Sequence, residues 1–284
     1  AATSAMGLTI NQVESATART LILHGKLKPS AIWEHKVELF NHEGLVSVHR
    51  STAGLEKLGG MYFFKDLLAK QVQKGNLHKI IIAGPAGCGK TSGAFALGYE
   101  YKLNVLEAHL GRLGGMYVGE SEKHTRHMQE IMEKNAPCIV VMDELPRYLN
   151  TDSGSDRRNG SAVDSKVGAE WLAWLSSPRS KDIMIVATAN DWNGVGTLIR
   201  SERFDFQAFT SIYSSPAKRK AIWDIYLKEY EHNITDSLYQ QLLTQSAYYT
   251  GAEIKTVCRL ASKKSLDEPI ETTLRRVGFD WNRP

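Results

Sequence analysis

The chain has 284 residues, of which 42% are hydrophobic and 23% are charged. This length and composition are typical of one or two globular domains, and they exclude a fibre, a coiled coil and a largely disordered chain. The 35 basic and 31 acidic residues leave a formal charge of +4, too small an excess to indicate a nucleic-acid surface.

The apolar runs are all far shorter than the roughly 20 residues that span a bilayer, and the N-terminus has no basic region followed by an apolar stretch. We therefore expect a soluble protein that is not exported and has no membrane partner. The cysteines Cys88, Cys138 and Cys258 are odd in number, and two lie in motifs where a disulfide would obstruct a ligand. This pattern predicts a reducing, cytoplasmic compartment.

Residues 1–50 are expected to form a short leader and a helix. Residues 1–20 are small and polar with little periodicity, which predicts a flexible segment. Residues 28–40, "KPSAIWEHKVELF", place apolar side chains at helical spacing after a proline suited to a first turn. Glycines interrupt the pattern over residues 41–60, and a helical pattern resumes over residues 61–75.

Residues 51–213 predict a large α/β domain, and residues 214–284 a smaller α-helical one. Apolar runs predict strands at residues 78–84, 103–110, 137–143 and 182–190, with helical patterns between them at 91–102, 121–135 and 167–177. Buried strands that alternate with helices indicate a parallel sheet covered on both faces. Three further helices are predicted at residues 216–230, 235–248 and 251–265.

A glycine-rich loop, "GPAGCGKTS", connects the first predicted strand of this domain to its helix. Its glycines let backbone N–H groups turn onto phosphate oxygens at a helix N-terminus, Lys90 would hold the β- and γ-phosphates of ATP, and Thr91 would bind Mg²⁺. The alternative is a chance turn, but strand, loop and helix occur in the order that binding requires. The predicted nucleotide-binding residues of the loop are Gly84, Pro85, Ala86, Gly87, Cys88, Gly89, Lys90, Thr91 and Ser92.

Asp143 and Glu144 follow an apolar strand at the edge of the sheet where ligands bind in open parallel sheets. Asp143 fits a Mg²⁺ ligand that acts through water, and Glu144 fits the base that polarises the attacking water. Asn190 ends another strand and can orient that water. The alternatives are helix caps for the two acids and a turn residue for Asn190.

With these motifs together, residues 51–262 resemble the AAA family of ring ATPases, in which a P-loop α/β domain is followed by a small helical lid. "GPAGCGKT" is similar to Walker A, "IVVMDE" to Walker B and "ATAN" to sensor 1. "LIRSERFD" resembles the second region of homology, which implies that Arg200 and Arg203 are arginine fingers reaching the γ-phosphate of a neighbouring subunit. Arginine stabilises charge on a transferring phosphoryl group. The alternative is that both arginines form surface salt bridges.

The segment "GGMYVGESE" resembles the loop that faces the ring pore in AAA unfoldases. The resemblance implies that Met116, Tyr117 and Val118 grip extended polypeptide, because an aromatic side chain packs on any sequence. The polar loop at residues 151–166 stands where the family has a second pore loop. The alternatives are a core position for Tyr117 and a merely solvated polar loop.

Two short segments resemble the family's adenine pocket. "TGAEIKTVCRLAS" is similar to the lid helix of the AAA subgroup that lacks a sensor-2 arginine, which implies that Gly251 and Ala252 lie near adenine and ribose. "AGLEKL" is similar to the family's Gly-Gly-Leu segment, which implies that Ala53 and Gly54 line the other side of the base. Small residues at these positions allow close approach.

The sequence also departs from the family pattern. Leu145 and Pro146 stand where most relatives have isoleucine and aspartate, the Asp-Gly-Phe intersubunit signal is missing, and no His-Glu-x-x-His site of a built-in zinc protease occurs. Residues 37–60 resemble an AAA group encoded by plastids and cyanobacteria, and "ANDW" before "LIRSERFD" resembles rubisco activase.

These features predict a homo-oligomeric ATPase, expected to be a hexamer, that remodels or translocates a protein through a central pore. A nucleic-acid-associated AAA+ ATPase of the loader or transposition type is the first alternative, and the low net charge argues against it. A P-loop kinase or an ATP-gated scaffold is the second. A kinase would act as a monomer, whereas a scaffold would assemble with ATP and hydrolyse it slowly.

Overall fold

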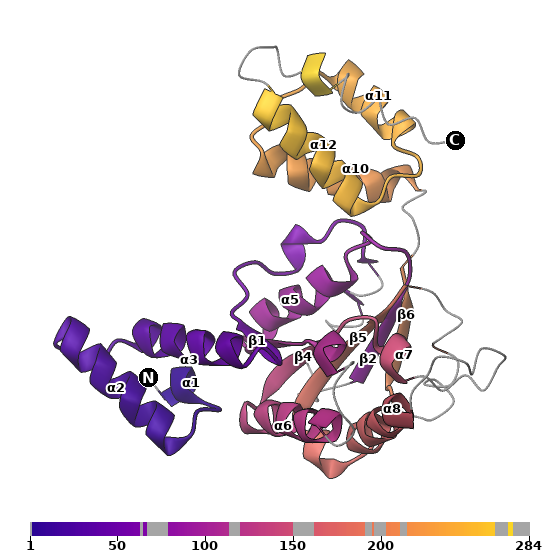
Figure 1. Cartoon of the computed structure of the whole chain (residues 1–284). Helices are drawn as coiled ribbons and strands as arrows, with labels where there is room; N and C mark the ends of the chain where they lie inside the picture. Colours follow the sequence, from indigo (N-terminus) through magenta and orange to yellow (C-terminus); the bar gives the residue numbers. More distant parts are fainter. Residues whose placement is uncertain are drawn as a thin grey trace.

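The computed structural model describes residues 2–62, 65–66, 79–113, 120–149, 162–190, 195, 203–210, 215–264 and 272–274. An α/β body lies between a helical N-terminal segment on one side and a helical C-terminal domain on another (Figure 1). No helix in these ranges is both long and apolar enough to cross a membrane. The predicted fold class, a mostly parallel sheet with helices on both faces followed by a small helical domain, is confirmed.

The sheet has six strands in the order β1-β3-β4-β5-β2-β6. Each neighbouring pair runs parallel except β1 and β3, which run antiparallel. The carboxyl ends of β2, β4 and β5 therefore meet at one edge, where ligands bind in sheets of this type. The strands are β1 (Val46–His49), β2 (Lys79–Ala83), β3 (Val105–Ala108), β4 (Cys138–Met142), β5 (Ile183–Ala189) and β6 (Phe206–Phe209).

Helices cover both faces of the sheet because β2, β4 and β5 carry apolar side chains in both directions. Ile80 and Ile82 of β2 pack in one core with α5 (Lys90–Tyr101), whereas Ile81 packs in the other core with α6 (Glu120–Lys134) and α8 (Ala162–Leu175). A strand that is buried on both faces has no solvent-facing positions for polar residues. The apolar runs of these strands are therefore continuous in the sequence. Short helical segments are α7 (Leu145–Leu149), η1 (Leu55–Lys57), η2 (Leu110–Leu113) and η3 (Pro178–Ser180).

Strand β1 was not predicted. It lies between two glycines and offers only a four-residue alternation, in which Val46 and Val48 are buried while Ser47 and His49 are half-buried. Pairing with β3, in which Val46 lies opposite Ala108, adds it to the edge of the sheet. The pattern was too short to be distinguished from a loop, and the neighbouring strand supplies the stability that it lacks alone.

The expectation of a flexible segment over residues 1–20 is wrong from Ile10 onward. Helix α2 (Ile10–His24) begins with a capping box, in which the Thr9 side chain accepts from the Gln12 backbone and the Gln12 side chain accepts from the Thr9 backbone. The Thr-x-x-Gln spacing was present in the sequence, but the small polar residues around it obscured the signal. The short helix α1 (Ala2–Ala5) precedes it, and the predicted helix over residues 28–40 is observed as α3 (Pro29–Glu43).

The C-terminal domain contains α10 (Pro216–Glu229), α11 (Asp236–Gln245) and α12 (Gly251–Lys264), as predicted. Trp223 of α10, Leu238 of α11 and Ile254 of α12 are fully buried in its separate core. This core also includes Cys88 of the glycine-rich loop, so the small domain packs directly against the predicted phosphate site. Most of the helix predicted over residues 61–75 lies outside the described residues.

Candidate nucleotide site

The glycine-rich loop turns sharply between β2 and α5. Gly84 has a φ of 149°, and a Cβ there would lie 2.1 Å from the carbonyl oxygen of Thr210, so only glycine fits beside β6. Gly87 has a φ of 79°, and a Cβ there would lie 2.9 Å from Thr250 Oγ1 of the small domain. At both positions the backbone conformation and the short distance to a neighbouring atom exclude a residue with a Cβ, so glycine is required.

Lys90 begins α5 and is held across the loop. Its amine donates to the carbonyl oxygens of Gly84 (2.6 Å) and Pro85 (2.9 Å) and to Asn190 Oδ1 (3.1 Å). The side chain is 7% exposed, and burial lowers its pKa below the ordinary value, whereas Cys88, Asp143 and Glu144 act in the opposite direction. Burial also raises the pKa of the Cys88 thiol. Lys90 is thus a partly desolvated cation at the predicted phosphate position.

Thr91 connects the loop to the carboxyl end of β4. Its hydroxyl donates to Asp143, at 3.0 Å to Oδ1 and 3.3 Å to Oδ2. Thr188 of β5 donates to the same carboxylate at 3.0 Å and accepts from the Glu144 backbone at 3.1 Å. A hydroxyl and a carboxylate that converge in this way are oxygen ligands of the kind that Mg²⁺ prefers, so the two predicted metal ligands fit the ion.

Glu144 is held between two partners. Its Oε1 accepts from Asn190 Nδ2 at 2.5 Å, and its Oε2 accepts from Arg147 Nη1 at 3.0 Å. Asn190 must present its oxygen to the Lys90 ammonium and its nitrogen to the carboxylate, so the amide bridges the two charged groups. Glu144 also has a φ of 52°, an uncommon conformation for a non-glycine residue.

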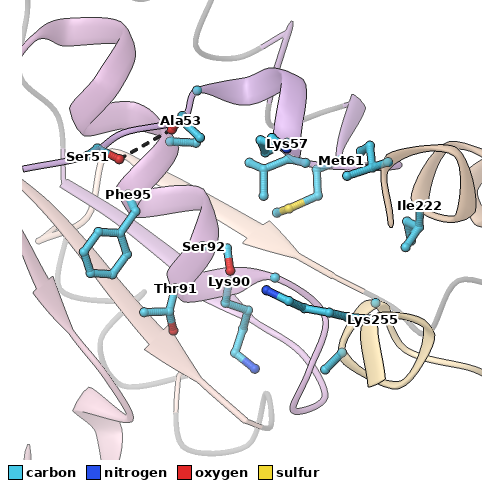
Figure 2. A pocket seen from close by; sticks show the side chains of 18 of the residues that line it. Ser51, Ala53, Lys57, Met61, Lys90, Thr91, Ser92, Phe95, Ile222 and Lys255 are labelled. Atoms are coloured by element: carbon cyan, nitrogen blue, oxygen red, sulfur yellow. Dashed lines mark hydrogen bonds between the residues drawn. The ribbon is translucent and has the colours of Figure 1, made fainter. Parts of the chain in front are cut away.

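A cavity of about 820 Å³ lies between the α/β body and the small domain. Its lining includes residues 87–92 of the loop, Ala53 and Gly54 between β1 and β2, and Gly251 and Ala252 of α12. Figure 2 shows Ala53, Lys90 and Lys255 of this lining. Ala252 N donates to Gly87 O at 3.1 Å, so the backbones of the two domains are joined at this point. The volume lies within the range of roughly 300 to 1,000 Å³ that is typical of small-molecule sites.

The structure brings most of the predicted site residues together. The loop residues from Gly87 onward line the cavity with both predicted adenine-side pairs, and Asp143, Glu144 and Asn190 are joined to Lys90 and Thr91 by hydrogen bonds. Gly84, Pro85 and Ala86 precede the lining residues, and the first two support Lys90.

Arg203 lies away from this cluster. It precedes β6, and its Nε donates to the Leu172 carbonyl of α8 at 3.2 Å. The next described contact, Asp205 N to Lys79 O at 2.8 Å, places this segment beside the start of β2, whereas the loop follows the end of β2. Arg200, Met116, Tyr117, Val118 and most of the predicted second pore loop lie outside the described residues.

Several residues at the site were not predicted. Thr188 lies in the quoted motif "ATAN", and its spacing of two residues from Asn190 was the signal that both side chains share one face of the strand. Arg147 is three residues after Glu144. This spacing brings the two side chains together only in a helix, and the helix α7 was not predicted. The cavity walls also include aromatic and charged side chains that no local pattern indicated: His49, Phe95, Tyr226 and Lys255.

Comparison with known proteins shows which family and which relatives the chain resembles. Residues 80–212 match the family described as "ATPase family associated with various cellular activities (AAA)". The chain is 27% identical over 282 residues to "Uncharacterized AAA domain-containing protein ycf46" of Trieres chinensis, a match that covers 94% of this chain and 56% of that protein. It is 28% identical over 218 residues to "Peroxisomal ATPase PEX6" of Arabidopsis thaliana, a match that covers 72% of this chain and 23% of that protein.

A third relative is "Cell division cycle protein 48 homolog" of Archaeoglobus fulgidus, which is 31% identical over 205 residues and is covered for 26% of its length. The chain thus spans about half the length of the ycf46 relative and about a quarter of the other two. Residues 80–212 of the chain belong to the AAA family. The similarity to ycf46 proteins confirms the predicted resemblance to the plastid AAA group.

Proposed function

We propose that the chain binds Mg-ATP in the cavity, hydrolyses it at the interfaces of a homo-oligomeric ring, expected to be a hexamer, and uses the energy to remodel or translocate a protein partner. The observation that supports this most directly is the set of hydrogen bonds from Lys90 through Asn190 to Glu144 beside a cavity of nucleotide size. The proposed catalytic unit is residues 51–213 with the lid at residues 214–284. Free thiols at Cys88, Cys138 and Cys258 support the cytoplasm as its compartment.

Phosphate binding follows from the loop. Lys90 exchanges its contacts with Gly84 and Pro85 for phosphate oxygens. Charged phosphate oxygens stabilise a buried ammonium group more than neutral carbonyl oxygens do. The N-terminus of α5 favours the same negative charge. Magnesium, when bound with the nucleotide, would neutralise phosphate oxygens, and Thr91 with Asp143 would hold it.

Glu144 acts on the attacking water in this proposal. Its carboxylate keeps free lone pairs beyond the bonds to Asn190 and Arg147, so it can accept a proton from a water at the open edge of the sheet. Asn190, bonded to both Lys90 and Glu144, keeps the base at a set position relative to Lys90, the residue that would hold the γ-phosphate.

The position of Arg203 supports a shared active site. Because Arg203 lies beside the start of β2 and the loop follows its end, the arginine is on the far side of the body from its own Lys90. An arginine in this position can contact a nucleotide only if the nucleotide is bound to another copy of the chain. We propose that Arg200 and Arg203 serve a neighbouring subunit, and that Met116, Tyr117 and Val118 contact the protein partner.

The first experiment measures assembly of Glu144→Gln by light scattering after size exclusion, with and without ATP and magnesium. The proposal expects small species without nucleotide and about six subunits with it, because the variant binds ATP without consuming it. A species that binds ATP and stays monomeric would remove the ring and leave a kinase-like ATPase.

A mixing experiment tests the shared site. Lys90→Met and Arg203→Ala should each be inactive alone, whereas their mixture should hydrolyse ATP, since an intact loop then meets an intact arginine at some interfaces. The matched control mixes Lys90→Met with Glu144→Gln, which both damage the nucleotide-binding side and therefore should not restore activity. Circular dichroism must show Arg203→Ala folded. Full activity of folded Arg203→Ala would contradict the trans arginine.

A further inference from the structure

The small domain contributes a cation to the nucleotide cavity that no motif assigned. Lys255 lines the cavity from α12 together with Tyr226 of α10, and its amine lies 5.6 Å from the centroid of the Tyr226 ring. Figure 2 shows the Lys255 side chain extending from α12 across the cavity toward the N-terminal end of α5, where Lys90 and Ser92 lie.

Helix geometry explains this direction. Lys255 follows Gly251 by four residues, so both lie on one face of α12. That face meets the loop, because a Cβ on Gly251 would lie 3.6 Å from Gly87 O and Ala252 N donates to the same oxygen. Long side chains in a helix point back toward its N-terminus, which for α12 is toward the phosphate loop.

The amine is free to take an anion. Within the part of the chain that the structure describes, Lys255 forms no ion pair or hydrogen bond, and its amine lies over the Tyr226 ring. The carboxylate in the same wall, Glu229, pairs instead with Lys57 at 3.7 Å. Among the described residues, Lys255 is therefore a cation in the cavity wall without a carboxylate partner.

We propose that Lys255 binds the polyphosphate of the nucleotide from the lid, as a second cation beside Lys90. The contact would add a link through the ligand to the direct hydrogen bond from Ala252 N to Gly87 O that already joins the small domain to the α/β body. This inference rests on the proposed ATP site and adds a phosphate-binding residue that the glycine-rich loop does not contain.

The test compares Lys255→Met, which keeps the apolar stem, with Lys255→Arg, which keeps the charge. Lys263→Met is the matched control, because Lys263 is exposed on α12 outside the cavity. Dissociation constants for ATP, ADP and AMP are measured by titration calorimetry. We expect Lys255→Met to weaken ATP about tenfold, with a smaller loss for AMP, and Lys255→Arg to stay within about threefold of the wild type.

The loss should also shrink as salt is raised from about 0.05 M to about 0.5 M, because the contact is electrostatic. Unchanged ATP affinity in folded Lys255→Met would overturn the proposal, as would an equal loss in Lys263→Met or an equal loss for AMP and ATP. Wild-type protein that binds ATP while Lys255→Met binds it equally refutes only the lysine assignment, whereas wild-type protein that binds no ATP refutes the proposed function.

Discussion

Two lysines are buried among the residues that the structure describes, and their surroundings differ in one respect. Lys36 of α3 is completely buried, and its amine donates to Met6 O and to Asn135 Oδ1, each at 2.6 Å. The rings of Trp33 and Phe40 lie 5.3 and 5.8 Å from the amine. Lys90 also donates to backbone carbonyls and an asparagine, but it lines an open cavity.

The difference teaches that burial of a cation does not by itself indicate function. The partners of Lys36 surround its amine completely. Its hydrogen bonds hold the N-terminal helices against the end of α6, so the charged group has a structural role. The partners of Lys90 leave one side open, where an anion can replace them. We therefore expect changes in open polar clusters to alter ligand chemistry, and changes in closed ones to alter the stability of the fold.

The largest expected effect lies in the open cluster. Glu144→Gln should lower the rate of ATP hydrolysis about a thousandfold and leave ATP affinity within about threefold, because the amide keeps the shape but cannot accept the proton. Turnover and binding are measured separately, by phosphate release and by calorimetry. Glu130→Gln, on the exposed face of α6, is the control and should behave as the wild type. Wild-type turnover in Glu144→Gln would assign the base to another group.

The second effect removes the open cation. Lys90→Met should weaken ATP binding about a hundredfold, since a charge-assisted contact with phosphate is lost. The unfolding free energy in urea should change by no more than about 1 kcal/mol, because water entering the cavity can bond to the released carbonyls. Lys36→Met is the matched variant and should keep the ATP affinity of the wild type. Loss of nucleotide binding in folded Lys36→Met would contradict the separation of the two lysines.

The third effect concerns the closed cation and pH. Burial lowers the pKa of Lys36 from 10.5 to about 8, with Cys138 and Arg50 as smaller influences. Above the folded pKa the native protein releases the proton while the unfolded chain keeps it, so the penalty for the buried charge disappears as pH rises. The unfolding free energy of the wild type should rise relative to Lys36→Met by about 2 kcal/mol between about pH 7.5 and about pH 10.

Urea unfolding of both proteins at the two pH values measures this difference. Lys26→Met is the control, because Lys26 is exposed and its removal should leave the pH dependence unchanged. A difference between wild type and Lys36→Met that stays constant over this range would show that Lys36 is not desolvated.

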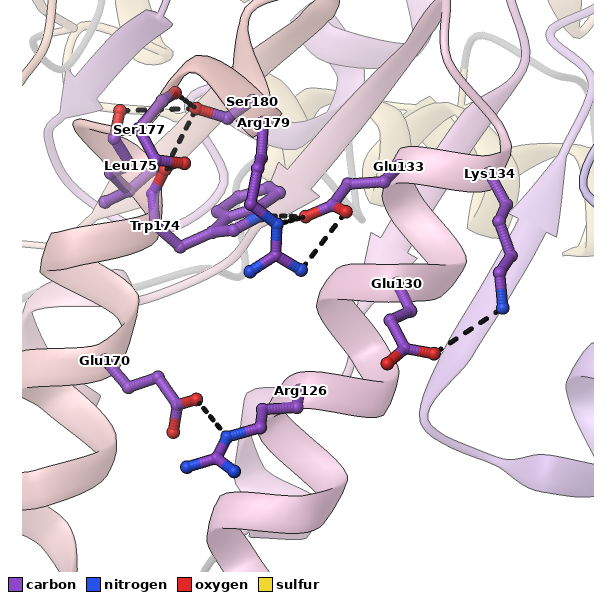
Figure 3. A network of polar contacts seen from close by, with 10 residues as sticks. All are labelled: Arg126, Glu130, Glu133, Lys134, Glu170, Trp174, Leu175, Ser177, Arg179 and Ser180. Carbon is purple, nitrogen blue, oxygen red and sulfur yellow. Dashed lines mark hydrogen bonds and ion pairs between the residues drawn. The ribbon is translucent and has the colours of Figure 1, made fainter.

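The smallest effect belongs to a half-buried polar cluster, which connects α6 to the end of α8 (Figure 3). Glu133 accepts from the buried Trp174 Nε1 at 2.7 Å and pairs with Arg179 at 2.9 Å. Glu133→Ala leaves the indole N–H without a partner and should destabilise the fold by about 1 kcal/mol. Glu130→Ala, which removes only an exposed pair with Lys134, should cost less than about 0.5 kcal/mol. Equal effects in thermal unfolding would contradict this assignment.

Much of the α/β body was predictable because its signals are local. The apolar runs of β2, β4 and β5 and the helical patterns between them determined the fold class, and strand ends placed Asp143, Glu144 and Asn190 at one edge. Strand β1 and helix α2 were missed, since a four-residue alternation and a single capping box are weak signals beside glycines and small polar residues.

The sequence by itself determined the glycine-rich loop and the acids beside it as the predicted phosphate site, because residue type and order are sufficient where backbone groups and a helix start form such a site. Only the tertiary structure decided how the rest of the cavity is built. The packing of α12 onto Gly87 places Lys255 over the loop, and the sheet order carries Arg203 away from its own Lys90. The physical reason is that these side chains lie far apart along the chain, so their relation depends on how separate elements pack.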